Sequence, residues 1–259
     1  MPQGPSSDVL RRNSVGLTGV TDARPIMFAH GFGCDQNMWR FVAPEFESDH
    51  RVILFDHVGA GGSDLSAYST ERYATLDGDA RDMVEIGETL GVMDGVFVGH
   101  SDAAMIGVLA HRMRAGMFSH LVLVDPSPYY LNDGDYQGGF TRADIKGLLD
   151  AMANNYLGWS SDMAPAIVGR PDRPELGEEL TISLCRTDPA IAEELPLDPS
   201  RRPHHQGQRD LPGVDRIRPG RPPLRTSAPG SPDARGTNLP PDSCGTDSRC
   251  GRVGPGDRR

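Results

Sequence analysis

The decisive stretch of this chain reads Val96-Phe97-Val98-Gly99-His100-Ser101-Asp102-Ala103-Ala104. A short apolar run, typical of a buried strand, ends at one serine, and an apolar helical pattern follows it directly. The order matches G-x-S-x-G, in which small residues flank a serine on a sharp strand-to-helix turn, with Ala103 in place of the last glycine. The stretch therefore predicts a nucleophile elbow with Ser101 as the nucleophile. The alternative is an ordinary serine that caps a core helix.

A second motif favours the elbow over the cap. His30-Gly31-Phe32-Gly33 follows the apolar run Ile26–Ala29, which is where α/β-hydrolases supply one backbone N–H of the oxyanion hole. The other N–H comes from the residue after the nucleophile. We therefore expect the backbone amides of Phe32 and Asp102 to form the oxyanion hole, a contribution of about 2.7–4 kcal/mol for each donor.

The pattern of apolar runs predicts the fold class. Four short runs are typical of strands buried on both faces of a sheet: Ile26–Ala29, Val52–Phe55, Val96–Val98 and Leu121–Val124. Helical periodicity appears between them over Asp79–Leu90 and Asp102–Met113. Alternating strands and helices predict an α/β protein with a mostly parallel, doubly wound sheet. Its functional site is expected at the carboxyl ends of the strands.

Beyond Pro126 the strands stop and helices follow one another. A capped start at Thr141 opens a helical pattern that continues to Tyr156, a second pattern begins at Pro174, and a third follows Thr187. Helices in this position predict a lid over the strand ends. The expected organisation is a core over residues 1–128, a helical lid over 129–196 and a tail over 197–259.

Several further motifs carry a family resemblance over roughly residues 10–196. They are His30-Gly31-Phe32-Gly33-Cys34-Asp35-Gln36, Arg51-Val52-Ile53-Leu54-Phe55-Asp56, Gly62-Ser63-Asp64-Leu65, Val96-Phe97-Val98-Gly99-His100-Ser101, Tyr130-Leu131-Asn132-Asp133 and Asn155-Tyr156-Leu157-Gly158-Trp159. Together they resemble the RsbQ-like α/β-hydrolases, bacterial stress-response regulators that are similar to plant strigolactone and karrikin receptors.

The resemblance implies a serine hydrolase with a small, largely apolar pocket under a four-helix lid, with no cofactor and no metal. It implies a small hydrophobic ester or lactone as ligand or substrate, and a sensor-domain serine phosphatase as partner in the pathway that activates a stress sigma factor. The residues expected to contact the ligand are His100, Phe32, Tyr129 and Trp159.

The same resemblance implies a triad acid and histidine after the lid, and the sequence there departs from the family. Residues 197–259 contain 11 prolines, 9 glycines and no aromatic residue, a composition that predicts disorder. After the elbow, the only weak substitute for the acid is Asp125, at the end of a strand, and the distal histidines are His204 and His205. We hypothesise a reading-frame shift near residues 195–199, which translation of the other two frames of the gene would test. The C-terminal strands and helix of the fold are expected to be missing, which predicts an unstable or insoluble chain.

Charge and cysteine content limit the classes of partner. The tail has 12 arginines against 7 aspartates, a net charge of +5, so the formal total of −10 leaves −15 for residues 1–196. An acidic body argues against nucleic acid or an anionic membrane as partner. No apolar run approaches the roughly 18 residues of a membrane span. Four cysteines at unrelated spacings indicate reduced thiols and a cytoplasmic protein.

Asp102 is the unusual residue of the motif, because RsbQ-like proteins have an apolar residue at this position. A carboxylate suits the N-terminus of the following helix but opposes a nearby oxyanion. We therefore expect weaker hydrolysis than with valine there. Three functions stay open: an ester or lactone hydrolase, a non-catalytic ligand-binding adaptor for a phosphatase, and a non-functional product.

Overall fold

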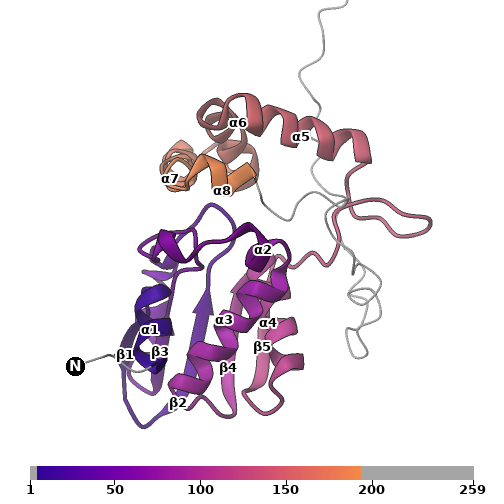
Figure 1. Ribbon diagram of the computed structural model, residues 1–259. Coiled ribbons are helices and arrows are strands. Elements are labelled where there is room, and N and C mark those ends of the chain that lie inside the picture. The colour runs from indigo at the N-terminus through magenta and orange to yellow at the C-terminus, as the bar shows by residue number, and fades with distance from the viewer. Residues whose placement is uncertain (1–4, 194–259) are drawn as a thin grey trace, which may run out of the picture. The chain divides into compact units, whose positions relative to one another are not determined.

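A computed structural model describes residues 5–193 of the chain (Figure 1). The sheet has five strands in the order β1-β3-β2-β4-β5. The strands are β1 (Gly16–Gly19), β2 (Arg24–Ala29), β3 (His50–Leu54), β4 (Gly95–His100) and β5 (Phe118–Val124). All neighbours pair in parallel except β1, which pairs antiparallel with β3. The four predicted strands are confirmed, and β1 is an addition that its two glycines and single large apolar residue did not signal.

Three longer helices cover one face of this sheet (Figure 1). They are α1 (Pro5–Arg12), α3 (Leu76–Thr89) and α4 (Asp102–Met113), and the short α2 (Thr70–Tyr73) precedes α3. The main hydrophobic core lies between these helices and the strands, with Met83 and Ile86 of α3 packed together with Ile53 and Phe97 of the sheet. Helix α4 begins directly after the serine and spans the predicted residues.

The opposite face of the sheet is covered unevenly. The 3-10 helices η1 (Gln36–Trp39) and η2 (Ala43–Phe46) cover β2 and β3, where Phe28, Trp39 and Val52 form a second apolar cluster. No described element covers the same face of β5. Val122 and Val124 are therefore 46% and 38% exposed. The expectation that this strand is buried on both faces is wrong for the described part of the chain, because β5 forms an edge there with one bare face.

Four helices follow the sheet: α5 (Arg142–Asn154), α6 (Tyr156–Val168), α7 (Pro174–Leu184) and α8 (Pro189–Glu193). A capping box at Thr141 starts α5, as the sequence predicts. The predicted continuation of this helix to Tyr156 is wrong, because Asn155 leaves helical geometry and caps a separate helix by accepting a hydrogen bond from Gly158 N. The short 3-10 helix η3 (Leu65–Ala67) lies earlier in the chain.

The helices after β5 contact the loop that follows β2. Ser183 Oγ donates a hydrogen bond to Gly33 O at 2.7 Å, and a Cβ added to Gly33 would lie 2.1 Å from Leu184 Cδ2. Phe32 packs against a cluster formed by Met152, Tyr156 and Ala192. The predicted tail over residues 197–259, with His204 and His205, lies outside the described residues, as do the last residues of the predicted lid.

Close packing of α4 on β4 gives a direct test of this core. A Cβ on Gly107 would lie 2.0 Å from Cε1 of Phe97, a fully buried ring, whereas a Cβ on Gly147 of α5 would meet no atom within 4 Å. We expect Gly107→Ala to lower the free energy of unfolding by about 1–3 kcal/mol. Gly147→Ala should raise it by about 0.5–1 kcal/mol, since alanine is the better helix former. Equal effects in urea unfolding would contradict this packing.

Candidate functional site

Ser101 lies at a strained reversal between β4 and α4. Its φ is 57° and its ψ is −120°, a conformation that a residue with a side chain rarely adopts. Its N–H donates to Val124 O at 2.9 Å, which ties the turn to the end of β5. The neighbouring backbone is crowded, because a Cβ on Gly99 would lie 2.8 Å from Ala103 O. The small residues of the motif are therefore required by packing, and the serine is held at the carboxyl end of the sheet.

The loop after β2 meets this turn at Gly31. A Cβ on Gly31 would lie 2.6 Å from His100 Nδ1 and 3.0 Å from Ser101 Cβ, so only glycine allows the loop to come this close. Phe32 follows immediately, and its backbone N–H is thereby held beside the start of α4. This is the geometry on which an oxyanion hole depends.

The Phe32 N–H donates to a side chain of the protein itself. Asp102 Oδ1 accepts it at 3.0 Å and also accepts the Ala103 N–H at 2.9 Å. Burial raises the pKa of the Asp102 carboxyl, while His30, the two amide donors and His100 act in the opposite direction. The predicted oxyanion hole uses the backbone N–H groups of Phe32 and Asp102. The Phe32 N–H is instead hydrogen-bonded to the Asp102 side chain.

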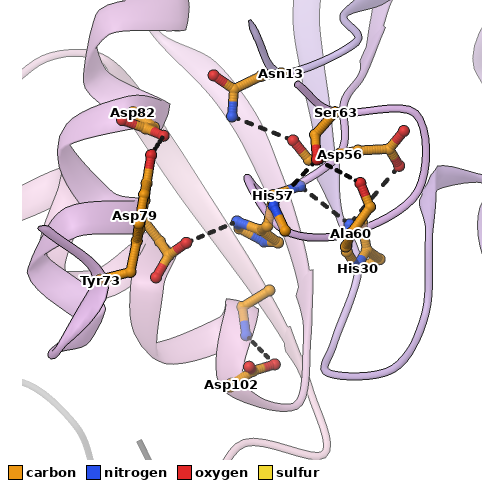
Figure 2. A network of polar contacts seen from close by, with 12 residues as sticks. Asn13, His30, Asp56, His57, Ala60, Ser63, Tyr73, Asp79, Asp82 and Asp102 are labelled. Carbon is orange, nitrogen blue, oxygen red and sulfur yellow. Dashed lines mark hydrogen bonds and ion pairs between the residues drawn. The ribbon is translucent and has the colours of Figure 1, made fainter. Parts of the chain in front are cut away.

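Asp56 holds the surrounding loops together. Its buried carboxylate accepts hydrogen bonds from Gln36 N, Gln36 Nε2 and Gly62 N at 2.8–2.9 Å. Its backbone exchanges two hydrogen bonds with Asn13, of which one is drawn in Figure 2. The loops after β2 and β3 are thus fixed to each other and to the N-terminal segment. Sequence analysis placed Asp56 in a motif but assigned it no structural role.

Two histidines stand between these loops. His30 Nδ1 lies 3.0 Å from Gly31 O, and His30 Nε2 accepts the His57 N–H at 3.2 Å, so the network assigns the proton to Nδ1. The rings of His30 and His57 meet edge to face at a centroid distance of 4.9 Å. Burial lowers the pKa of His57 well below its ordinary value, and His30 lowers it further. His57 is therefore neutral at pH 7.

His57 faces an acid that sequence analysis missed (Figure 2). His57 Nδ1 lies 3.6 Å from Asp79 Oδ1 of α3. Burial raises the pKa of Asp79 well above its ordinary value, and the negative charges of Asp102 and Asp82 add to the effect. The available signal was that Asp79 interrupts the buried face of an amphipathic helix one turn before Met83.

These groups line a cavity of about 80 Å³. Phe32, His57, Asp79 and Asp102 line it, together with apolar side chains that include Ile106 of α4. Ile191 of α8 closes it from the helical segment after β5. The arrangement is a small, largely apolar cavity with two largely buried carboxyl groups and two imidazoles. Ser101 itself does not line it, whereas its sequence neighbour Asp102 and the facing Gly31 do.

The four residues predicted to contact the ligand do not all lie at the cavity. Phe32 lines the cavity, whereas His100, Tyr129 and Trp159 do not. His100 Nδ1 is buried beside Gly31 with no hydrogen-bond partner among the described residues. Tyr129 is buried in a different cluster with Ile145. Trp159 stacks on Tyr156 and packs against the cluster that Phe32 joins.

A base and an acid for Ser101 are not assembled in the described part of the chain. Within residues 5–193, no imidazole nitrogen forms a hydrogen bond with Ser101 Oγ. Asp125, the weak substitute for the acid, follows β5 with a φ of 49° and is exposed, and over the same residues no hydrogen bond joins its side chain to a histidine. Burial raises the pKa of the Cys34 thiol to about 11, with Asp102 and Asp35 adding to the shift, which disfavours this thiol as a nucleophile.

The fold and this turn define the class of protein. A mostly parallel sheet in which β4 leads to a serine in a strained turn, opposite a glycine-rich loop, is the arrangement of an α/β-hydrolase. The family described as alpha/beta hydrolase fold matches residues 24–161, and the chain belongs to this family. The predicted fold class is confirmed.

The relatives are esterases and plant receptors by name. The chain is 41% identical over 167 residues to "Karrikin insensitive 2 receptor CA" of Petunia hybrida, covering 64% of this chain and 62% of that protein. It is 38% identical over 185 residues to "Strigolactone esterase D14" of Arabidopsis thaliana, covering 71% and 68%. The chain thus spans 62% of the length of the first of these relatives. The predicted similarity to strigolactone and karrikin receptors is confirmed.

Solved structures agree on the fold. A hydrolase from Oleispira antarctica superposes with a TM-score of 0.70 at 42% identity, covering 73% of this chain and 69% of that one. A bromoperoxidase from Bacillus anthracis superposes with a TM-score of 0.62 at 17% identity, over 70% and 66%, and shows the fold alone. In the described part of the chain, no helix has the length and apolar character that a bilayer span needs.

Asp79 makes the stability of this site depend on pH. In the unfolded chain its carboxyl ionises above an ordinary pKa of about 4, whereas the folded protein keeps it protonated to higher pH. Ionisation therefore destabilises the fold progressively as pH rises above about 4. We expect Asp79→Asn to raise the free energy of unfolding at pH 8 by an amount on the order of 1 kcal/mol, and the gain should vanish toward pH 4.

Thermal melts at pH 4, 6 and 8 measure this effect. Asp162→Asn, on the exposed surface of α6, is the matched control because it removes the same formal charge outside the cavity. A gain for Asp79→Asn that is equal at pH 4 and pH 8 would contradict the assignment of a disfavoured buried charge.

Proposed function

We propose that this chain is an RsbQ-like receptor or serine hydrolase for small hydrophobic esters or lactones, with impaired hydrolysis. The observation that carries the proposal is the elbow itself: Ser101 is held at a φ of 57°, and the next residue, Asp102, lines a small apolar cavity and accepts the Phe32 N–H. The names of the relatives, which are esterases and strigolactone or karrikin receptors, support a small ligand of this chemistry.

The size and lining of the cavity support the ligand class. A volume of about 80 Å³ admits a small group, and its walls include Leu76, Ile106 and Ile191. The hydroxyl of Ser101 would face the carbonyl of an ester or lactone at the rim of this cavity. An acyl transfer would then need a base for the serine proton and donors for the oxyanion.

Two features support impairment. The Phe32 N–H is already bonded to Asp102, and within residues 5–193 no histidine is bonded to the serine hydroxyl. Both features favour ligand holding over turnover. They also favour the second candidate function, a non-catalytic adaptor that binds its ligand without cleaving it.

The signalling role is proposed from the resemblance to RsbQ. In this role the ligand-loaded protein engages a sensor-domain serine phosphatase in the cytoplasm, and the phosphatase acts on the pathway of a stress sigma factor. Pull-down of such a phosphatase by the full chain, with and without a small lactone, tests the partner. Equal capture in both conditions would argue against a ligand-dependent adaptor.

Ligand binding and turnover are measured separately on the full chain. γ-Octalactone, a small hydrophobic lactone, is titrated while tryptophan fluorescence is followed, and saturable binding is expected. Hydrolysis of 4-nitrophenyl butyrate is expected within about tenfold of the Ser101→Ala rate, since an unactivated serine reacts poorly. A fluorophosphonate probe should label Ser101 slowly for the same reason.

A matched pair of variants locates the ligand. Ile191→Phe fills the cavity from α8, whereas Ile182→Phe adds the same ring on the exposed surface of α7. We expect the first to weaken lactone binding about tenfold or more and the second to leave it unchanged. Absence of saturable binding would overturn the ligand class, and fast turnover that depends on Ser101 would overturn the impairment.

A further inference from the structure

Asp102 places its carboxylate on the Phe32 N–H, one of the two amides expected to bind a reacting carbonyl oxygen. Oδ1 accepts one hydrogen bond from Phe32 N at 3.0 Å and another from Ala103 N at 2.9 Å. The two donors come from segments about 70 residues apart, the loop after β2 and the first turn of α4. An acceptor shared by donors from two elements is held more firmly than a cap within one helix.

Local geometry explains why this side chain can reach both donors. Asp102 is the first residue of α4, so its short side chain folds back over its own helix terminus, where a negative charge is stabilised. The close approach at Gly31 brings the Phe32 amide to the same point. A valine here would offer no acceptor, and a glutamate would place its carboxylate one methylene farther out.

Four ionisable groups interact with this carboxylate: two histidines, an acid and a thiol. They are His30 after β2, His100 at the end of β4, Asp79 of α3, and Cys34 of the loop after β2. No described lysine or arginine bonds to it. A second anion at this point would meet one backbone donor already in use and one full negative charge within a few ångströms.

We propose that Asp102 is a built-in occupant of the oxyanion site, which excludes anionic ligands and restricts the site to neutral carbonyl compounds. The inference rests on the proposed function, because it names the ligands that the same cavity accepts and rejects. Neutral esters and lactones carry no charge for the Asp102 carboxylate to repel. Carboxylates, including the products of ester hydrolysis, are rejected by the carboxylate already present.

The experiment compares a carboxylate with its neutral counterpart on the full chain at pH 8. Butyrate and butyramide are titrated into ¹⁵N-labelled protein, and the Phe32 amide signal is followed by NMR. The wild type is expected to bind butyramide more tightly than butyrate. Asp102→Val frees the Phe32 N–H, and we expect its affinity for butyrate to rise about tenfold or more, the effect of a hydrogen bond to a charged group.

Two further variants distinguish the effect of occupying the Phe32 N–H from the effect of negative charge in the cavity. Asp79→Asn removes a second acid from the same cavity and leaves the Phe32 N–H bonded to Asp102, so its affinity for butyrate should rise less than about threefold. Asp102→Asn removes the charge but keeps a side-chain oxygen that can accept both N–H groups. Because it keeps these hydrogen bonds, it provides a second test if Asp102→Val fails to fold. It should bind butyrate more weakly than Asp102→Val.

The outcomes are decisive in both directions. Equal gains in Asp102→Val and Asp79→Asn would overturn the proposal, because general electrostatics would then suffice. An unchanged Phe32 amide signal in Asp102→Val would overturn it as well. All of these measurements can be repeated with Ser101→Ala, so they are independent of hydrolysis: a failure of lactone binding rejects the proposed function, whereas a failure of the butyrate gain rejects only the role of Asp102.

Discussion

The reversal of the backbone at Ser101 is the constraint on which the rest of the site depends. A non-glycine residue at a φ of 57° persists only when its surroundings hold it there. Here β5 holds it through the bond from Ser101 N to Val124 O, and α4 follows without a connecting residue. The loop after β2 can approach only because Gly31 has no side chain. The conformation of this one turn therefore depends on the strand order, the position of α4 and the conformation of the loop after β2.

The same turn brings ionisable groups into a poorly solvated space. Asp79 and Asp102 share one cavity with two imidazoles, and burial raises the pKa of both carboxyls. Asp56, in contrast, is fully bonded by backbone and amide donors and serves as the fixed point of the loops. The site thus combines a rigid polar support with two acids whose charges oppose each other and any incoming anion.

Sequence reasoning succeeded where the pattern is local. The runs that became β2, β3, β4 and β5 are short and apolar, helical periodicity separates the later ones, and the start of α4 follows from the serine motif. Sequence reasoning failed where the outcome depends on contacts with other parts of the structure. The bare face of β5 depends on which elements cover it, and the break between α5 and α6 depends on Asn155, which caps a new helix. His57 and Asp79 are 22 positions apart, and no local pattern predicts their contact.

The sequence by itself determined the class of protein and the position of its serine. The reason is that a strand, a turn of small residues and a helix follow one another within a few residues, so the local residue pattern is enough to identify them. Only the tertiary structure decided what the Phe32 amide binds. Phe32 and Asp102 lie 70 positions apart, and their hydrogen bond at 3.0 Å exists because Gly31 lets the two segments approach. A carboxylate that looks like a helix cap in the sequence becomes, through that approach, the occupant of the oxyanion site.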